Sequence, residues 1–299
     1  MKRNMSLCAL TTVLASPALG VGTLHGHWKF NESSGTTAAD SGPGSFNGTL
    51  NNAATFGAGG IEGNALVLPA GGGGFVEMPV IPINTPPLSI SAWVKTTSAS
   101  HSIVAGRHIA TIVAGYFVAL NNGGTYGLPG KAYGYVSAVP GQEPISSITV
   151  NDGQWHHVVM TFGSGSPVTL FVDGAFQAAK PNPGFSPTPA PLLVGAVATT
   201  SGGRMPAYEG MIDDLQVYNG RLSGPQICAI FNNPGMPAPG ACNGDVDMNN
   251  VVNFADLNLV LSSYGQMGFC LAADIDADGA VNFADLNQVL SAYGSSCTP

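Results

Sequence analysis

The chain has 299 residues, of which 44% are hydrophobic, 8% aromatic and only 9% charged. These apolar and aromatic side chains are enough to build a core, which excludes global disorder, and the length allows one or two domains. The formal net charge of -8 argues against electrostatic attraction to nucleic acids or to anionic membranes. We expect no nucleic-acid partner.

The first 22 residues have the pattern of a signal peptide. Lys2 and Arg3 precede an apolar stretch at 7–14, and small residues at 16–20 offer a cleavage site. The stretch is shorter than the roughly 18 apolar residues that a membrane-spanning helix needs, and no later stretch is long and apolar enough. The sequence therefore predicts export, cleavage of residues 1–22, and a secreted or cell-surface protein without a membrane span.

Residues 23–231 predict a domain built almost entirely of β-strands. Leu88, Ile90, Ala92 and Val94 alternate with residues of the opposite face, which is typical of a strand. Similar short runs, separated by segments rich in Gly, Asn, Pro and Ser, occur at 26–30, 115–120, 131–137, 155–162, 168–172, 192–195 and 210–218. This pattern favours a mainly β fold, an antiparallel jelly-roll sandwich.

Two local signals in this domain predict specific structures. Asp173-Gly174 lies between two strand runs and predicts a type I′ hairpin turn, because both residues tolerate positive φ. Ser223 and Gln226 have the spacing of a capping box and predict a helix over 225–231.

The same domain lacks a recognisable catalytic pattern. His156 and His157 are neighbours on a predicted strand, so their side chains point to opposite faces and cannot share a metal or a substrate. No Glu-x-Asp-x-Glu motif occurs, and the glutamates are isolated at 32, 62, 77, 143 and 209. No Gly-x-Ser-x-Gly elbow is present either. We expect a non-catalytic protein, with an enzyme of unfamiliar active site as the alternative.

Five segments, taken in order, carry a family resemblance. They are GHWKFNESSGTTAADS at 26–41, SISAWV at 89–94, DGQWHHVVMTF at 152–162, LFVDG at 170–174 and EGMIDDLQVY at 209–218. Together they resemble the successive strands of a laminin-G-like, concanavalin-type jelly roll. The resemblance implies two packed antiparallel sheets, a carbohydrate- or protein-binding role and often a structural calcium ion, for which Asp40 and Asp213 are the candidate ligands.

The charge pattern changes after a Pro- and Gly-rich linker at 232–240. Residues 241–299 contain seven Asp and no Lys or Arg, and they form a second predicted domain. Four cysteines remain after signal cleavage, and an exported chain can oxidise them to disulfides. Three pairings are open, of which Cys228–Cys242 with Cys270–Cys297 closes the shortest loops.

The second domain contains a duplication. Residues 251–265 recur as residues 280–294 with twelve of fifteen positions identical and a period of 29. Each copy overlaps a calcium-loop pattern, within repeats at 245–265 and 274–294, in which oxygen atoms at positions 1, 3, 5, 7, 9 and 12 surround a hard cation. The predicted ligands of two Ca²⁺ ions are Asp245, Asp247, Asn249, Val251 (backbone carbonyl), Asn253 and Asp256 in the first loop, and Asp274, Asp276, Asp278, Ala280 (backbone carbonyl), Asn282 and Asp285 in the second.

Each loop leads into a predicted amphipathic helix. Position 6 of such a loop often needs positive φ, and it is held by Asn250 in the first loop and Gly279 in the second. The helices are expected to bury one apolar face each. The two predicted faces are Phe254, Leu257, Val260, Leu261 and Tyr264, and Phe283, Leu286, Val289, Leu290 and Tyr293.

Two loop–helix units without the entering helix of a full EF-hand resemble a type I dockerin over residues 242–297. The resemblance implies a docking module that binds a cohesin-like partner, usually in bacterial polysaccharide-degrading assemblies. Cohesin-binding dockerins usually carry hydroxyl residues at loop positions 10 and 11, whereas this chain has Phe254-Ala255 and Phe283-Ala284. We expect these phenylalanines to serve the core.

These patterns predict an exported binding protein. Its jelly roll would bind a polysaccharide or glycoprotein, and its calcium-dependent module would dock to another protein. Two alternatives stay open: a glycoside hydrolase-like enzyme, which would need two converging carboxylates, and a structural or adhesive surface protein without a discrete ligand.

Overall fold

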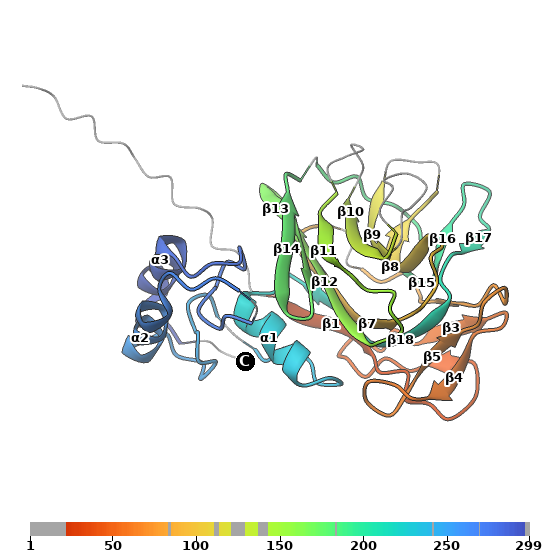
Figure 1. Ribbon diagram of the computed structural model, residues 1–299, viewed down its shortest axis with the longest axis horizontal. Coiled ribbons are helices and arrows are strands. Elements are labelled where there is room, and N and C mark those ends of the chain that lie inside the picture. The colour runs from red at the N-terminus through yellow and green to blue at the C-terminus, as the bar shows by residue number, and fades with distance from the viewer. Residues whose placement is uncertain are drawn as a thin grey trace, which may run out of the picture.

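The computed structural model describes residues 22–82, 85–110, 114–120, 129–136, 143–182, 184–240, 242–268 and 270–296. A β-sandwich occupies one end of the molecule, and a small unit with helices α2 (Phe254–Ser263) and α3 (Phe283–Ala292) occupies the other (Figure 1). Helix α1 (Gly224–Asn232) lies between them. Residues 1–21 of the predicted signal peptide fall outside the described residues.

The first sheet of the sandwich is antiparallel throughout its described strands. Its path runs in the order β14 (Ala175–Lys180), β13 (Ser166–Val172), β12 (His156–Gly163), β7 (Leu88–Lys95), β18 (Gly210–Asn219), β5 (Asn64–Leu68) and β4 (Thr55–Ala58). An additional strand, β1 (Thr23–Trp28), pairs with β18. Sequence neighbours such as β12, β13 and β14 form hairpins, while β7 and β18 meet from distant parts of the chain.

The second sheet packs face to face on the first. Its order is β11 (Ile145–Thr149), β10 (Lys131–Val136), β9 (Gly115–Leu120), β8 (Ser102–His108), β15 (Leu193–Val194), β6 (Phe75–Glu77), β3 (Gly48–Asn51) and β2 (Thr37–Ala38). A separate hairpin joins β16 (Ala196–Ala198) to β17 (Arg204–Pro206). The prediction of a mainly β, antiparallel jelly-roll sandwich is confirmed.

The core of the sandwich fills the space between the two sheets. Strand alternation supplies it: Tyr116, Val118 and Leu120 of β9 belong to this core, whereas Phe117 and Ala119 lie on the opposite face of the same strand. Burial of these apolar side chains is the main favourable term in folding of the sandwich.

Both local predictions in the sandwich are confirmed. Asp173 and Gly174 have φ values of 53° and 72° and join β13 to β14 with Val172 opposite Ala175, as a type I′ turn requires. In α1, the Gln226 backbone N–H donates to the Ser223 side chain and the Ser223 N–H donates to the Gln226 side chain.

The two loop–helix units fold as one body through crossed pairing. Val251 of the first loop forms an isolated bridge with Ser296 after α3, and Ala280 of the second loop forms one with Met267 after α2. Their shared core consists of Val246, Val252, Val260, Ala273, Ile275, Val281 and Val289. Neither unit buries its apolar residues alone, which explains why the unit is duplicated.

The predicted apolar faces of α2 and α3 are only partly correct. Val260 and Val289 are fully buried, but Phe254 is 60% exposed and Phe283 is 59% exposed. The other exposed members of the predicted faces are Leu261, Tyr264, Leu290 and Tyr293. The expectation that the phenylalanines serve the core is wrong, because they sit at the first helical position, outside the small core between the two units.

The segment predicted as a linker is bound to the sandwich by buried polar groups. The Gly235 N–H donates to the Asp214 carboxylate at 2.8 Å, and the Ala238 N–H donates to the Tyr218 hydroxyl at 2.8 Å. The Gln216 side-chain amide donates to the Met236 carbonyl. Within the described residues the linker therefore follows the surface of the sandwich.

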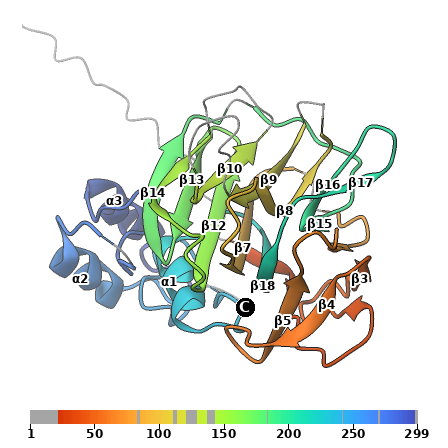
Figure 2. The ribbon, with the colours of Figure 1, turned by 45° about the vertical axis from the view of Figure 1, so that its right-hand side comes forward.

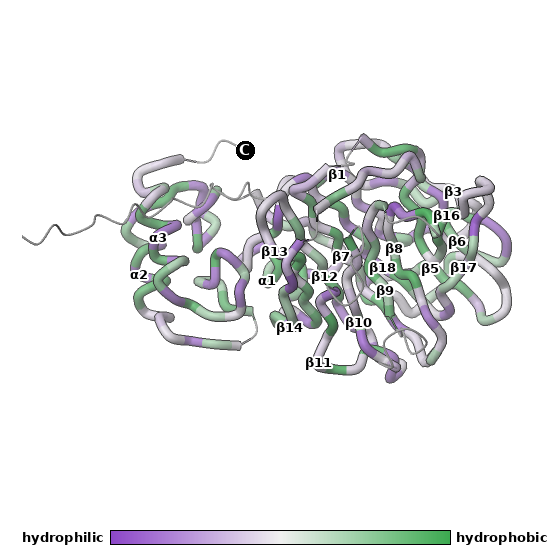
Figure 3. The backbone as a smooth tube through the Cα atoms, turned by 90° about the horizontal axis from the view of Figure 1, so that it is seen from above, coloured by the Kyte–Doolittle hydropathy of each residue, from purple (hydrophilic) through white to green (hydrophobic). Residues whose placement is uncertain are grey.

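Figure 3, seen from above, shows the sandwich and the unit that carries α2 and α3 beside each other.

Candidate functional site

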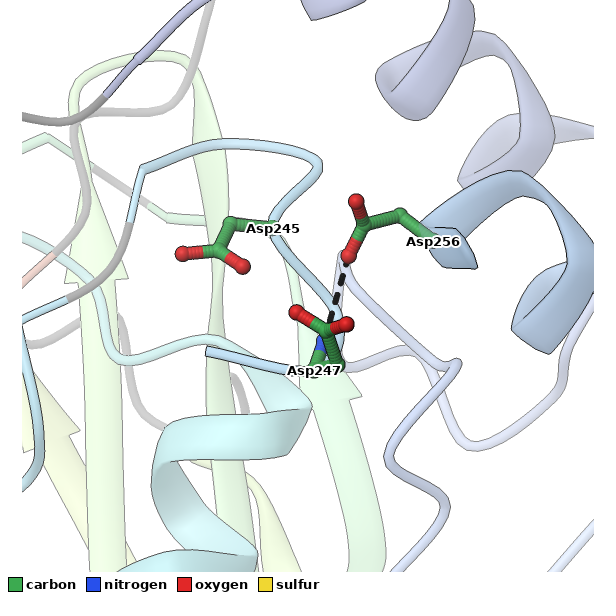
Figure 4. Close-up of side chains that lie close together, drawn as sticks. All are labelled: Asp245, Asp247 and Asp256. Carbon is green, nitrogen blue, oxygen red and sulfur yellow. Dashed lines mark hydrogen bonds between the residues drawn. The ribbon is translucent and has the colours of Figure 1, made fainter. Parts of the chain in front are cut away.

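The first acidic loop gathers carboxylates from the loop and from the start of α2. Oxygen atoms of Asp245, Asp247 and Asp256 lie within 4.8 Å of one another (Figure 4). Asp245 accepts the backbone N–H groups of residues 249 and 250, and Asp256 accepts those of residues 246, 247 and 253. These hydrogen bonds wrap the loop around the carboxylates and leave their oxygen atoms close together.

The second loop repeats this arrangement. Here Asp274, Asp276 and Asp278, at loop positions 1, 3 and 5, have oxygen atoms within 4.8 Å of one another, whereas the first group holds positions 1, 3 and 12. Asp274 accepts the N–H groups of residues 278 and 279, and Asp285 accepts those of residues 275, 276 and 282. One oxygen of Asp276, Oδ1, is buried and has no hydrogen-bond partner. A buried carboxylate oxygen without a donor fits a site that a cation completes.

Both loops use left-handed backbone at the predicted position. Asn250 has φ 71° and Gly279 has φ 94°, which confirms that position 6 needs a residue tolerant of positive φ. Position 4 is left-handed as well, with φ values of 58° at Met248 and 56° at Ala277, and residue type does not predict this. Such strain is tolerated where the surrounding structure holds it.

The predicted amide ligands also stabilise the loops through hydrogen bonds. Asn253 and Asn282 are N-caps, and their side-chain oxygens accept the N–H groups of residues 255 and 284. The Asn249 side-chain oxygen accepts the Val251 N–H. The predicted carboxylates are thus brought together, while these amides stabilise the loop and the start of the helix that follows it.

Burial raises the pKa values of four of the loop carboxylates. Burial, reinforced by neighbouring carboxylates, raises the pKa of Asp274 to about 7 and that of Asp276 to about 6. Burial likewise raises the pKa of Asp245 and of Asp285. A divalent cation would favour the ionised forms, and the oxygen-only donor set fits a hard ion. Both acidic clusters could therefore hold a metal ion.

Asp40 and Asp213 serve the backbone of the sandwich. Asp40 accepts the N–H groups of His27, Gly42 and Phe46 at 2.7–2.8 Å. Asp213 is buried on β18 and accepts the Ile61 N–H at 2.8 Å, and burial raises its pKa to about 7. The two carboxylates fix different loops, at 42–46 and at 61–62, and their role as ligands of one calcium ion stays a prediction.

The adjacent histidines diverge, as strand alternation predicts. His156 pairs with Asp173 and Asp152, and these hydrogen bonds raise its pKa. His157 is buried on the other face, where it bonds the Ser91 hydroxyl at 2.8 Å.

The glutamates that the structure describes have structural partners. Glu77 forms a bidentate pair with Arg204, Glu209 accepts the Gly71 N–H, and Glu62 accepts the Asn31 amide.

A cluster of rings lies on the second sheet, on the face turned away from the sandwich core. Phe117 of β9 stacks on its register partner Tyr135 of β10, with ring centroids 4.5 Å apart. His108 packs against both rings, and His101 stacks on Tyr133 and bonds its hydroxyl at 2.5 Å. We call these five residues the ring face. Tyr133 and Tyr135 alternate with small residues in the sequence, but residue spacing does not predict the ring face, because cross-strand register brings the rings together.

The ring face is neutral and partly accessible. Burial lowers the pKa of His101 and of His108, so both imidazoles are uncharged at neutral pH. Phe117 and Tyr133 are buried, His108 and Tyr135 are half-buried, and His101 is exposed. Aromatic side chains with a few polar groups are the usual lining of a site for a small organic ligand.

Comparison with known families assigns the sandwich. The family model described as the concanavalin A-like lectin/glucanases superfamily matches residues 70–228. The chain belongs to this superfamily. No curated protein matches the chain closely enough to name a relative. The concanavalin-like sandwich extends before the matched segment, because β1 to β5 complete its two sheets.

Solved structures of the concanavalin-like fold resemble the sandwich. Domain 4 of an extracellular arabinanase from Geobacillus stearothermophilus, in complex with arabinotriose, matches with 21% identity and a TM-score of 0.54 over 69% of this chain and 97% of that one. Trypanosoma rangeli sialidase matches with 17% identity and a TM-score of 0.51 over 73% of this chain and 36% of that one. The binding domain of Paraclostridial Mosquitocidal Protein 1 matches with 11% identity and a TM-score of 0.51 over 68% of this chain and 53% of that one. At these identities the comparisons establish the fold alone.

In the described part of the molecule, no helix is long and apolar enough to cross a membrane.

Proposed function

We propose that this protein is an exported, non-catalytic glycan-binding protein whose C-terminal unit is a calcium-dependent docking module. The ring face on a concanavalin-like sandwich is the observation that supports glycan binding. The apolar C–H face of a sugar ring packs on aromatic rings, and side chains such as His108 and the tyrosine hydroxyls can bond its hydroxyl groups. The bound arabinotriose of the arabinanase domain supports a polysaccharide as the ligand class.

Binding to soluble polysaccharides and their oligosaccharides tests the glycan half. Tyr135→Ala should weaken binding roughly tenfold or more, because it removes the half-buried ring that stacks on Phe117. Tyr264→Ala is the matched control, since Tyr264 is an exposed tyrosine on the C-terminal unit, away from the ring face. Retention without release of reducing sugar supports the proposal, whereas release would favour the glycoside hydrolase. Absence of binding to every polysaccharide and oligosaccharide tested would favour a structural or adhesive protein.

The acidic loops support calcium as the ion of the C-terminal unit. Two Ca²⁺ ions would change the charge of residues 241–299 from -7 to about -3, which relieves repulsion among the seven Asp. Calcium titration of the chelator-treated full chain should give two binding events and a gain of helix. Isothermal titration calorimetry counts the binding events, and circular dichroism measures the helix content. A chain that keeps its full helicity in chelator would contradict the proposal.

The exposed apolar side chains of α2 and α3 support docking to a protein. Phe254 and Leu261 lie seven residues apart and share a face of α2, and Phe283 and Leu290 repeat this face on α3. A cohesin-like domain is the partner that the dockerin resemblance implies. Because the two faces are near duplicates, either one can bind, so a single change should have little effect.

Pull-down with a panel of cohesin domains tests the docking half. Leu261→Asp or Leu290→Asp alone should keep binding, and the double variant should lose it. Tyr135→Ala is the control, because it alters the ring face only. Binding by the double variant, or none by the unmodified protein, would contradict a cohesin partner while leaving the glycan result intact.

A further inference from the structure

Two cysteines that are far apart in the sequence meet where the C-terminal unit touches the sandwich. Cys228 lies on α1 and is 8% exposed, and Cys270 lies four residues before the second acidic loop and is half-buried. Both carry free thiols, and the thiol of Cys228 donates a hydrogen bond to the sulfur of Cys270. The two side chains also line one small cavity.

The surrounding contacts hold Cys270 in this place. Its backbone N–H donates to the Gly174 carbonyl at 3.1 Å, at the tip of the β13–β14 hairpin. Its sulfur would be 2.8 Å from a Cβ at Gly174, so glycine there leaves room for the thiol. Figure 2 shows α1 beside this hairpin and next to the unit that carries α2 and α3.

Cys242 does not compete for these thiols. Cys242 is disulfide-bonded, whereas Cys228 and Cys270 are both free. The pairing that closes the shortest loops, Cys228–Cys242 with Cys270–Cys297, is therefore not formed.

We propose that Cys228 and Cys270 form a disulfide that fastens the C-terminal unit to the sandwich. In an oxidising compartment the Cys270 thiolate attacks a disulfide RSSR, such as oxidised glutathione, and releases RS⁻. The Cys228 thiol loses its proton to RS⁻ and attacks the Cys270–S–SR bond, releasing the second RS⁻, which is protonated by solvent. Two protein thiols and RSSR thus give one protein disulfide and two RSH.

The roles of the two sulfurs follow from their surroundings. The hydrogen bond from Cys228 lowers the pKa of Cys270, and Cys270 is the more accessible of the two, so it meets the oxidant first. Cys228 is buried and completes the bond from within. The C-terminal unit would then keep one orientation on the sandwich and would not swing on a tether. Formation of this disulfide depends on the positions of the two sulfurs and not on any glycan, calcium ion or cohesin.

Oxidation of the folded full chain with a glutathione redox buffer tests the proposal. Trypsin leaves all the cysteines of residues 222–299 in one peptide, because that segment contains no Lys or Arg. Chymotrypsin cleaves after Phe231 and separates Cys228 from Cys242. Mass spectrometry under non-reducing conditions should find the Cys228–Cys270 link, and Cys228→Ser and Cys270→Ser should each abolish it and leave the Cys242 bond intact.

The unfolding temperature provides a second test of the Cys228–Cys270 disulfide. The oxidised protein should unfold roughly 5 °C or more above the Cys228→Ser/Cys270→Ser double variant, and reduction should remove most of the difference. Full alkylation of both thiols after the redox treatment would overturn the proposal. A bond from either cysteine to another partner in the folded protein would overturn it as well.

Discussion

His157 shows how a buried titratable residue makes the sandwich sensitive to pH. The imidazole is 1% exposed, lies 5.1 Å from the ring of Trp93 and has one nitrogen, Nδ1, without a hydrogen-bond partner. Burial lowers its pKa from 6.5 to about 4, although Asp214 and Asp173 favour the charged form. The folded state therefore keeps this residue neutral where the unfolded chain would protonate it.

The lowered pKa of His157 determines how the free energy of unfolding changes with pH. Because the folded pKa is lower than the unfolded one, the contribution of His157 to stability is fully present above pH 6.5 and is lost as the pH falls toward 4. The loss should approach about 3 kcal/mol. Urea unfolding at several pH values should show this slope in the native protein and a flatter profile in His157→Gln. An unchanged slope in the variant would show that other groups cause it.

At the scale of elements, the hairpin between β13 and β14 links local turn chemistry to tertiary contact. Gly174 adopts φ 72°, and a Cβ there would also lie 2.8 Å from the Cys270 sulfur and 3.2 Å from the Phe231 ring. The turn therefore needs glycine for two reasons, of which only the positive φ is visible in the sequence. Gly165, in the turn between β12 and β13, has φ 71° and open space around it.

This difference gives a matched pair of variants. Gly165→Ala should cost about 1 kcal/mol, the penalty of a left-handed alanine. Gly174→Ala should cost roughly 1 kcal/mol more, because the new methyl group also displaces the sulfur and the ring. Chemical unfolding of the two variants measures the difference. Equal losses would show that the C-terminal unit does not press on this turn in solution.

At the scale of the molecule, the second loop lies against the sandwich. Ala277 of this loop belongs to an apolar cluster with Phe171, Leu222 and Ile227. A Cβ on Gly224 would overlap the Asp274 carbonyl oxygen, so α1 and the loop are in close contact. Burial at this interface lowers the pKa of Arg221 and raises that of Asp276, and the attraction between their opposite charges partly offsets both shifts. Calcium in the second loop should therefore stabilise the sandwich as well as its own unit.

Equivalent changes in the two loops test this coupling. Asp247→Asn and Asp276→Asn alter position 3 of each loop and should each weaken calcium binding to that loop by roughly tenfold or more. Only Asp276→Asn should also lower the unfolding temperature of the sandwich in calcium. Tryptophan fluorescence reports the sandwich selectively, because Trp28, Trp93 and Trp155 all lie there. Equal shifts in the two variants would contradict the coupling.

Features that depend only on neighbouring residues can be predicted from the sequence. Strand alternation, the Asp173-Gly174 turn, the Ser223 capping box and the acidic loop spacing are local, and the structure has each of them. Tertiary structure alone decided which rings meet on the ring face, which side of α2 is exposed and where the second loop lies. It also brought Cys228 to Cys270 rather than to the nearer Cys242. These outcomes depend on register and packing between distant segments, and residue spacing carries no record of such contacts.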